Sequence, residues 1–416
     1  MRTIKEYDDL LVLPSQTLSV LQLRALSEPL LPNLKMAVLS RVSGDSIPFV
    51  PLLLSPRTTT IHLRLFKLDD HMPTAASMIK LLPTLCPNLH DIRLYDLPKN
   101  PMITTAVSEL VLSIKQNTIR HFYVDSPLTE EAHKVICTNA DLCTLKTVID
   151  EPTALLMVLP NLTDIEIEYN SGHEWLQGFC GASLGKLASF VVYSESDLIG
   201  DFLAAFESVT LTTSISETLS TFKLHTSCLW RPSYRSLLPF TQLKELIIDS
   251  ECEPMISCSS TIDDDTITDL ARAMPKLEVL ALGCEPCDLP TGVTVKGLTA
   301  LAHYCPRLTE LTVHFQVASL DPSEIPHPAV TNEPTIPQES CVLKTLNVGY
   351  ICVPGGSSLV ITLSLLNIFP NLEVILYSDS DDEGWEKIEE AICNSKQLIR
   401  RSSKKRLLSF VALDQH

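Results

Sequence analysis

The sequence predicts an α/β solenoid, with parallel strands on its concave face and helices on its convex face. A short phrase, L-x-x-L-x-L, recurs along the chain, and amphipathic helical patterns separate its copies. Aromatic residues make up only 6% of the 416 residues, against 45% hydrophobic residues, which suits a core of many similar aliphatic layers. The phrase begins at Leu18, Leu34, Thr58, Leu89, Ile119, Leu145, Leu162, Leu187, Leu219, Leu243, Leu277, Leu308, Leu343 and Leu372.

The spacing of these copies matches that of leucine-rich repeats. Neighbouring copies start 16 to 35 residues apart, and most intervals lie between 24 and 34, near the characteristic period of about 20 to 29. The weakest copies are Thr58, where Thr replaces the first Leu, and Leu145, whose phrase ends on Asp150. Because one strand and one helix cannot bury a core alone, the repeats are expected to stack.

Each phrase predicts a strand, because alternate residues of a strand face opposite sides. In the segment LTDIEIEY, Ile165 and Ile167 form the inward set. The outward set of the same segment is Asp164, Glu166 and Glu168.

The segments between the phrases predict helices, because apolar residues recur there at steps of three and four. The clearest examples cover 105–119, 263–277 and 293–308. A proline disfavours helix in the residue before it. Helix ends are therefore predicted close to Pro87, Pro160, Pro275, Pro306 and Pro370.

The domain organisation expected from this pattern is one solenoid over residues 1–395, with about 14 repeats. Two segments rich in Pro, Ser and acidic residues, 250–265 and 316–340, depart from the period and are read as loops, either surface insertions or arms that contact a partner. Residues 396–416 form a basic tail, in which Arg400–Arg406 is either a nuclear signal or a solvated segment.

Composition and charge exclude several classes of protein. The net charge of -18 argues against a nucleic-acid partner or an anionic membrane, which need clustered Lys and Arg. The 13 cysteines are scattered, and the chain starts without a signal-peptide pattern. We therefore expect free thiols and a cytoplasmic or nuclear location. The longest apolar run, near 357–377, is too interrupted to span a membrane.

Three motifs resemble ligand sites, and none carries the required pattern. Asp379–Glu390 has the acids of a calcium loop, but a strand pattern precedes it. Cys284 and Cys287 form a C-x-x-C without a second pair. Gly181–Leu187 is one residue short of a P-loop and has Leu in place of the metal-binding Ser or Thr. We expect no catalytic residue, no cofactor and no metal, and hence no enzyme activity.

Four segments carry a resemblance to a known family: Leu30–Lys35, Ser46–Phe66, Leu81–Pro98 and Gly297–Phe315. The chain resembles leucine-rich-repeat F-box proteins of the mushroom-forming fungi, with ribonuclease-inhibitor-like repeats forming a horseshoe. The resemblance implies that the repeats hold a protein substrate. In that family an N-terminal F-box docks on a cullin-type ubiquitin ligase, but no F-box pattern is seen in this sequence.

The expected function is a protein–protein interaction scaffold, the substrate-recognition part of an F-box-type ubiquitin ligase receptor lacking its F-box. The alternative is a free-standing leucine-rich-repeat binding or inhibitor protein with no ligase role. The partner is a protein substrate, and a ligase adaptor only if an F-box exists upstream.

The predicted binding surface is the concave strand face, where helices cannot cover the side chains. Charged and aromatic residues there are typical of binding hot spots, and the acids at 164–168 predict a ligand with a basic segment. The candidate residues are Arg64, Arg93, Tyr95, His121, Tyr123, Asp164, Glu166, Glu168, Tyr193, Lys223, His225, Glu245, Glu310, Thr312 and His314.

Overall fold

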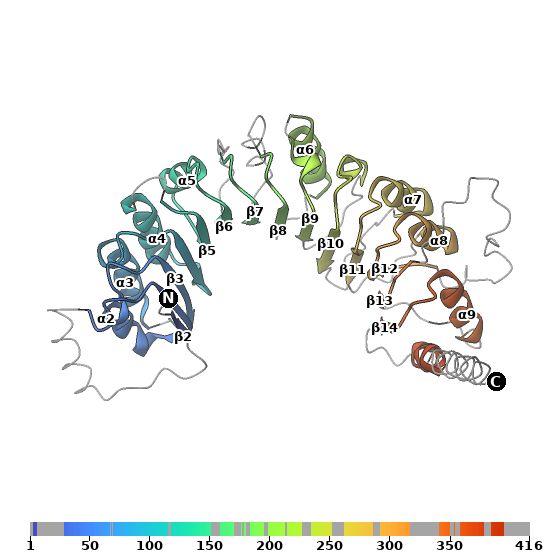
Figure 1. Ribbon diagram of the computed structural model, residues 1–416, viewed down its shortest axis with the longest axis horizontal. Coiled ribbons are helices and arrows are strands. Elements are labelled where there is room, and N and C mark those ends of the chain that lie inside the picture. Colours follow the sequence, from blue (N-terminus) through green and yellow to red (C-terminus); the bar gives the residue numbers. More distant parts are fainter. Residues whose placement is uncertain are drawn as a thin grey trace, which may run out of the picture. The chain divides into compact units, whose positions relative to one another are not determined.

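A computed structural model gives the fold (Figure 1). It describes residues 3–5, 29–66, 68, 70–114, 118–150, 159–169, 176, 179, 184–194, 199–212, 214–226, 234–251, 262–285, 292–316, 341–349, 353, 358–377 and 384–394. The chain divides into two compact units. The first unit comprises 1–196 and 205–219, and the second comprises 197–204 and 220–416.

The first unit contains an open, all-parallel sheet whose strands follow one another in chain order. Helices α3, α4 and α5 lie along one side of its strands β3 to β6 (Figure 1). The strands are β1 Thr3–Lys5, β2 Met36–Ser43, β3 Thr60–Phe66, β4 Asp91–Tyr95, β5 His121–Pro127, β6 Thr144–Ile149, β7 Asp164–Tyr169 and β8 Ser189–Ser194. The helices are η1 Gly44–Phe49, α2 Val50–Leu53, α3 Met72–Leu85, α4 Pro101–Ser113, α5 Glu130–Cys137 and η3 Ile215–Glu217.

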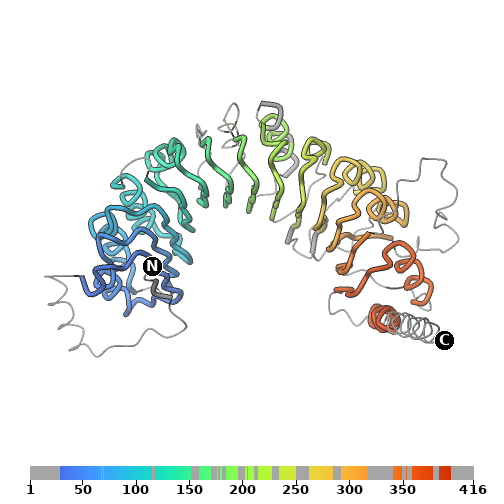
Figure 2. Tube along the Cα trace, in the orientation of Figure 1, coloured from blue at the N-terminus to red at the C-terminus, as the bar shows by residue number. Residues whose placement is uncertain are grey.

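The second unit repeats the arrangement, and Figure 2 shows that in each unit the chain path is a series of similar turns. Its strands are β9 Thr221–Thr226, β10 Glu245–Glu251, β11 Val279–Glu285, β12 Glu310–Val313, β13 Thr345–Gly349 and β14 Val374–Tyr377. Its helices are η4 Tyr234–Leu237, α7 Asp264–Ala273, α8 Val295–Tyr304 and α9 Ser358–Ile368, and residues 384–394 are also helical. The division between the units runs through α6, Ile199–Thr212.

The parallel α/β architecture predicted from the sequence is confirmed within each unit. The prediction of a single solenoid over residues 1–395 requires the two units to be continuous with each other. It stays a prediction. Leu18 and the tail 396–416 lie outside the described residues, as do 252–261 and 317–340. The segment predicted as a loop over 250–265 is shorter at both ends in the structure, because β10 continues to Glu251 and α7 begins at Asp264.

The predicted helix ends are confirmed at several repeats, and proline explains their common geometry. Cys86, Met274 and Cys305 each precede a proline and end a helix with nearly the same backbone angles, φ -116 to -133° and ψ 64 to 69°. The proline ring excludes its predecessor from the helical region. The backbone N–H of each of these residues still bonds to the helix, for example Met274 to the Leu270 carbonyl at 2.9 Å.

Side chains cap the N-termini of α4, α5, α7 and α8. Asp263 caps α7 by accepting a 2.8 Å hydrogen bond from the Thr266 N–H, and Asp264 and Asp265 occupy the first turn. Asn100 caps α4 by accepting from the Met102 N–H at 2.8 Å. These caps satisfy N–H groups that the helix itself leaves unpaired.

A ladder of backbone bonds outside the strands fixes the repeat register. Between successive repeats of the same unit, the residue after the first Leu donates to its equivalent one repeat earlier, as Thr163 does to Cys143 at 2.8 Å. Cys143 in turn bonds to Arg120 at 2.7 Å, so the repeat that contains β6 begins at Leu142. The prediction that this copy begins at Leu145 was therefore wrong, because a buried Thr147 takes the place of the last apolar residue of the phrase.

Candidate functional site

The candidate residues lie on the side of the strands that the helices leave uncovered, called here the open face. In β7 the burial alternates: Ile165, Ile167 and Tyr169 are buried, whereas Asp164, Glu166 and Glu168 are half-buried or exposed. The same alternation places the other predicted residues of both units on the open face, with His314 directly after β12. The alternation of side chains expected from the sequence is therefore confirmed in these strands, and the contacts of the side chains come from the structure.

A shallow hollow of about 220 Å³ lies on the open face of the first unit. It extends over β4 to β8, so it lies within this unit. Its lining is Arg93, His121, Phe122, Tyr123, Thr144, Leu145, Lys146, Asp164, Ile165, Glu166, Ser189 and Val191. Five of these were candidates from the sequence: Arg93, His121, Tyr123, Asp164 and Glu166.

Lys146 is the centre of the largest charge network beside the hollow. Its Nζ lies 2.9 Å from Asp125 Oδ1 and 2.8 Å from Glu166 Oε1, and it donates to the Tyr123 hydroxyl. Burial alone would lower the pKa of Lys146, but the hydrogen bonds with Glu166, Tyr123 and Asp125 outweigh burial and raise that pKa. Lys146 is therefore a fixed cation that joins strands β5, β6 and β7.

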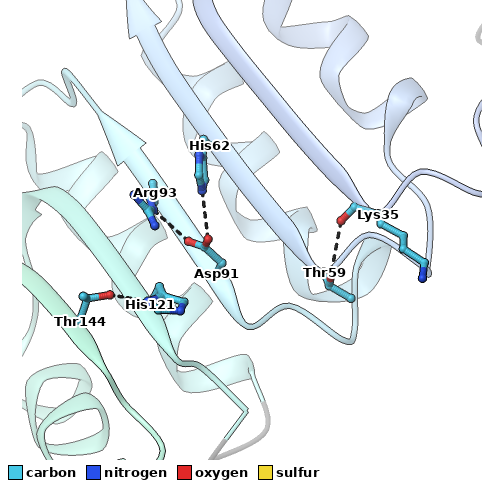
Figure 3. Close-up of polar contacts among 7 residues, drawn as sticks. All are labelled: Lys35, Thr59, His62, Asp91, Arg93, His121 and Thr144. Atoms are coloured by element: carbon cyan, nitrogen blue, oxygen red, sulfur yellow. Dashed lines mark hydrogen bonds and ion pairs between the residues drawn. The ribbon is translucent and has the colours of Figure 1, made fainter. Parts of the chain in front are cut away.

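A second network surrounds Asp91 at the edge of the hollow (Figure 3). His62 Nε2 lies 3.1 Å from one carboxylate oxygen of Asp91, and Arg93 Nε lies 3.0 Å from the other. Burial would raise the pKa of Asp91, but the hydrogen bonds from His62 and Arg93 outweigh it and lower that pKa. Asp91 is consequently a carboxylate at neutral pH.

His121 lies between these networks, with its Nδ1 2.6 Å from the Thr144 hydroxyl oxygen (Figure 3). Partial burial lowers the pKa of His121. The ring is therefore neutral at pH 7 and adds no charge to the hollow. The same close-up shows Thr59 donating to the Lys35 carbonyl at 3.3 Å, a polar contact between neighbouring repeats.

Two neighbouring aromatic rings lie between two cations on the open face of β3 to β6. The rings of Tyr95 and Tyr123 lie 4.6 Å apart between centroids. Arg64 lies 5.7 Å from the Tyr95 ring, and Lys146 lies 4.3 Å from the Tyr123 ring. Such contacts restrict the rotamers of long side chains, so this surface is ordered before any partner arrives.

The sequence predicts a negative patch formed by the acids at 164–168, but in the structure two of these three carboxylates are paired with lysines. Glu166 is paired with Lys146, and Glu168 Oε1 lies 3.0 Å from Lys99 Nζ. Asp164 accepts a 2.6 Å hydrogen bond from the Thr163 hydroxyl, and no described cation lies within ion-pair distance of it. Asp164 is thus the carboxylate of this group that remains for a ligand.

The open face of the second unit is less charged. Lys223 pairs with Glu245 at 2.7 Å, and His225 Nδ1 lies 2.7 Å from Asp249. Further along, β11 presents Val279, Ala281 and Gly283 on this face.

Sequence reasoning missed Lys146, and the reason is the misplaced repeat start. With the copy at Leu145, Lys146 fell outside the set of outward positions. The spacing contained a usable signal, since a start at Leu142 lies 20 residues before Leu162, whereas Leu145 lies only 17 before it. Asp91 and Asp125 were also missed: Asp91 is bonded by Arg93 on its own strand and by His62 on β3, and Lys146, which pairs with Asp125, lies on β6.

The described residues contain no group of three His, Cys, Asp or Glu side chains that could hold a metal ion. Cys284 lies in β11, while Cys287 and residues 379–383 of the calcium-loop-like segment lie outside the described parts of the chain. The cysteines whose side chains the structure describes are Cys86, Cys137, Cys143, Cys305, Cys341 and Cys393, and all six are free. Among the helices that the structure describes, none has the length and hydrophobicity needed to cross a membrane.

In comparisons with known proteins, no family model and no curated protein matches this chain.

Proposed function

We propose that the chain is a leucine-rich-repeat scaffold of the ribonuclease-inhibitor-like kind that binds a protein partner on its open face. The observation that carries this proposal is the ordered row of charged and aromatic side chains, from Arg64 to Glu168, that no described helix covers. Preorganised side chains of these types lose little entropy on binding and are typical of interface hot spots.

The local chemistry favours binding over catalysis. The nearest approach to a nucleophile and base is Thr144 with His121, at 2.6 Å. The Thr144 N–H is bonded to the Arg120 carbonyl at 3.1 Å, so it is unavailable to stabilise an oxyanion. Lys146 is held by two carboxylates, and its raised pKa does not suit a general base.

Within this function, the resemblance to leucine-rich-repeat F-box proteins favours substrate recognition for a ubiquitin ligase. The segment that carries the most specific part of this resemblance is Ser46–Phe66, which includes most of η1 and all of α2 and β3. A free-standing binding or inhibitor protein uses the same open face without a ligase. The genomic sequence upstream of Met1 separates the two: an in-frame F-box there supports the ligase role, and coding sequence without one supports the free-standing role.

A photo-crosslinking experiment tests the use of the open face. A benzophenone amino acid replaces Tyr193, which is 38% exposed on β8, or Leu112, which is 49% exposed on α4. The two positions are similarly exposed but lie on strand and helix surfaces of the same unit. We expect discrete crosslinked partners from Tyr193 and few from Leu112. Equal crosslinking at both positions, or crosslinking at Leu112 alone, would contradict the proposal.

A further inference from the structure

The hollow in the first unit is formed by short side chains set among long ones. Strand register places Thr144, Asp164 and Ser189 side by side on β6, β7 and β8. The next row of the open face contains Lys146, Glu166 and Val191. Neighbouring strands are about 4.8 Å apart, so short side chains in adjacent strands leave a continuous depression. Its volume, about 220 Å³, equals roughly seven water molecules.

The charge around the hollow is negative. Four carboxylates line it or pair with its lining: Asp91, Asp125, Asp164 and Glu166. Two permanent cations, Arg93 and Lys146, oppose them. His121 is neutral at pH 7, because burial lowers its pKa. A ligand that adds positive charge is therefore favoured over one that adds negative charge.

The position of the unmatched charge is also defined. Arg93 is held by Asp91 at 3.0 Å, and Lys146 is held by both Asp125 and Glu166. Asp164 alone among the four carboxylates has no described cation within ion-pair distance. Its neighbour in the next strand, Ser189, offers a hydroxyl acceptor in the same row.

We propose that this hollow receives one arginine side chain from an exposed segment of the partner protein. This inference rests on the proposed function and adds the chemistry of the partner. A guanidinium presents donors in a planar fork that matches a carboxylate. The Asp164 carboxylate accepts two of these donors, and the guanidinium plane packs against the ring of His121, which also lines the hollow.

Capped tripeptides test the proposal on the full chain. Acetyl-Gly-Arg-Gly-amide is titrated by NMR at low salt, beside equivalent peptides with Lys, citrulline or Glu in the centre. We expect millimolar binding of the arginine peptide, at least threefold weaker binding of the lysine peptide, and no saturation with citrulline or Glu. Because the attraction is between exposed charges, raising the salt tenfold should weaken binding.

A matched pair of variants locates the site. Asp164→Asn should weaken the arginine peptide about fivefold, whereas Asp141→Asn removes the same charge from an exposed position outside the hollow and should change binding less than twofold. Thermal melts of both variants confirm that the fold is intact. Equal effects of the two variants, or tightest binding of the lysine or Glu peptide, would overturn the proposal.

The outcomes separate this inference from the proposed function. If the arginine peptide fails to bind while crosslinking at Tyr193 persists, the arginine site is wrong and the open face still binds a protein. If crosslinking at Tyr193 itself is absent, the proposed function fails.

Discussion

His133 should make the first unit sensitive to acid well above the pH at which its carboxylates protonate. This residue lies on α5 and is 4% exposed, and its Nε2 lies 3.1 Å from the hydroxyl oxygen of Thr147 on β6. It also makes a hydrogen bond to the backbone of Leu128. Burial lowers the pKa of His133 to about 4, from the ordinary value of 6.5.

The sign of the effect follows from proton linkage. Below pH 6.5 the unfolded chain binds a proton at His133 that the folded chain excludes down to about pH 4. The contribution of neutral His133 to the free energy of unfolding is therefore fully present above pH 6.5. It decreases as the pH falls from 6.5 to about 4, and His133 causes no further loss below that pH. Between pH 7 and pH 5 the loss from His133 amounts to about 2 kcal/mol.

Urea unfolding at pH 7 and pH 5 measures this loss in the wild type and in His133→Gln. The variant does not titrate at this position, so the stability difference between the two proteins should shift by about 2 kcal/mol between the two pH values. Parallel pH curves for the two proteins would refute the reasoning.

A second pair of variants tests the role of Thr147. Thr147→Val alone leaves the buried imidazole nitrogen of His133 without its partner and should cost about 1–3 kcal/mol. The double variant, His133→Phe combined with Thr147→Val, should recover part of that loss, because it leaves no unpaired polar group. A double variant that costs the sum of the two single changes would mean that the pair is not coupled.

Three other substitutions have defined outcomes. Lys146→Met should lower the free energy of unfolding by about 3 kcal/mol, because it leaves two carboxylates unpaired; adding Glu166→Gln should restore part of the loss, and a neutral single variant would show that the network is not stabilising. Gly297→Ala should cost about 1–3 kcal/mol in thermal melts, because its new Cβ would lie 2.7 Å from Asp264 Oδ1, which accepts from the Gly297 N–H. The control Gly283→Ala meets nothing within 4 Å, and an equal loss there would contradict the steric argument. Tyr234→Phe should be neutral or stabilising by about 1 kcal/mol, because the buried phenol oxygen has no hydrogen-bond partner among the described residues; a clear loss in urea unfolding would reveal one.

The local features of this protein could be predicted from its sequence because their causes are local. Alternation along a strand depends only on backbone geometry, so the positions of Ile165 and Glu166 on opposite faces followed from the phrase itself. The effect of a proline acts on the residue before it, so the helix ends at Leu85, Ala273 and Tyr304 were predictable within two residues.

The contacts across strands required the tertiary structure. Lys146 neutralises Glu166 and Asp125 because strand register brings together residues that are 20 and 21 positions away from it. The sequence predicted an acidic patch at 164–168, whereas the structure leaves Asp164 as the carboxylate without a described cation.

The repeat register shows the same limit. Thr147 interrupts the apolar pattern and hid the true repeat start at Leu142, although His133, on a preceding helix, satisfies its hydroxyl in the core. Apart from β6, where the repeat start was misplaced, the sequence by itself determined which face each residue of the repeat strands occupies, since that depends on the alternation of the backbone. Only the tertiary structure decided which charges remain for a partner, since an ion pair depends on distances between strands that no single repeat contains.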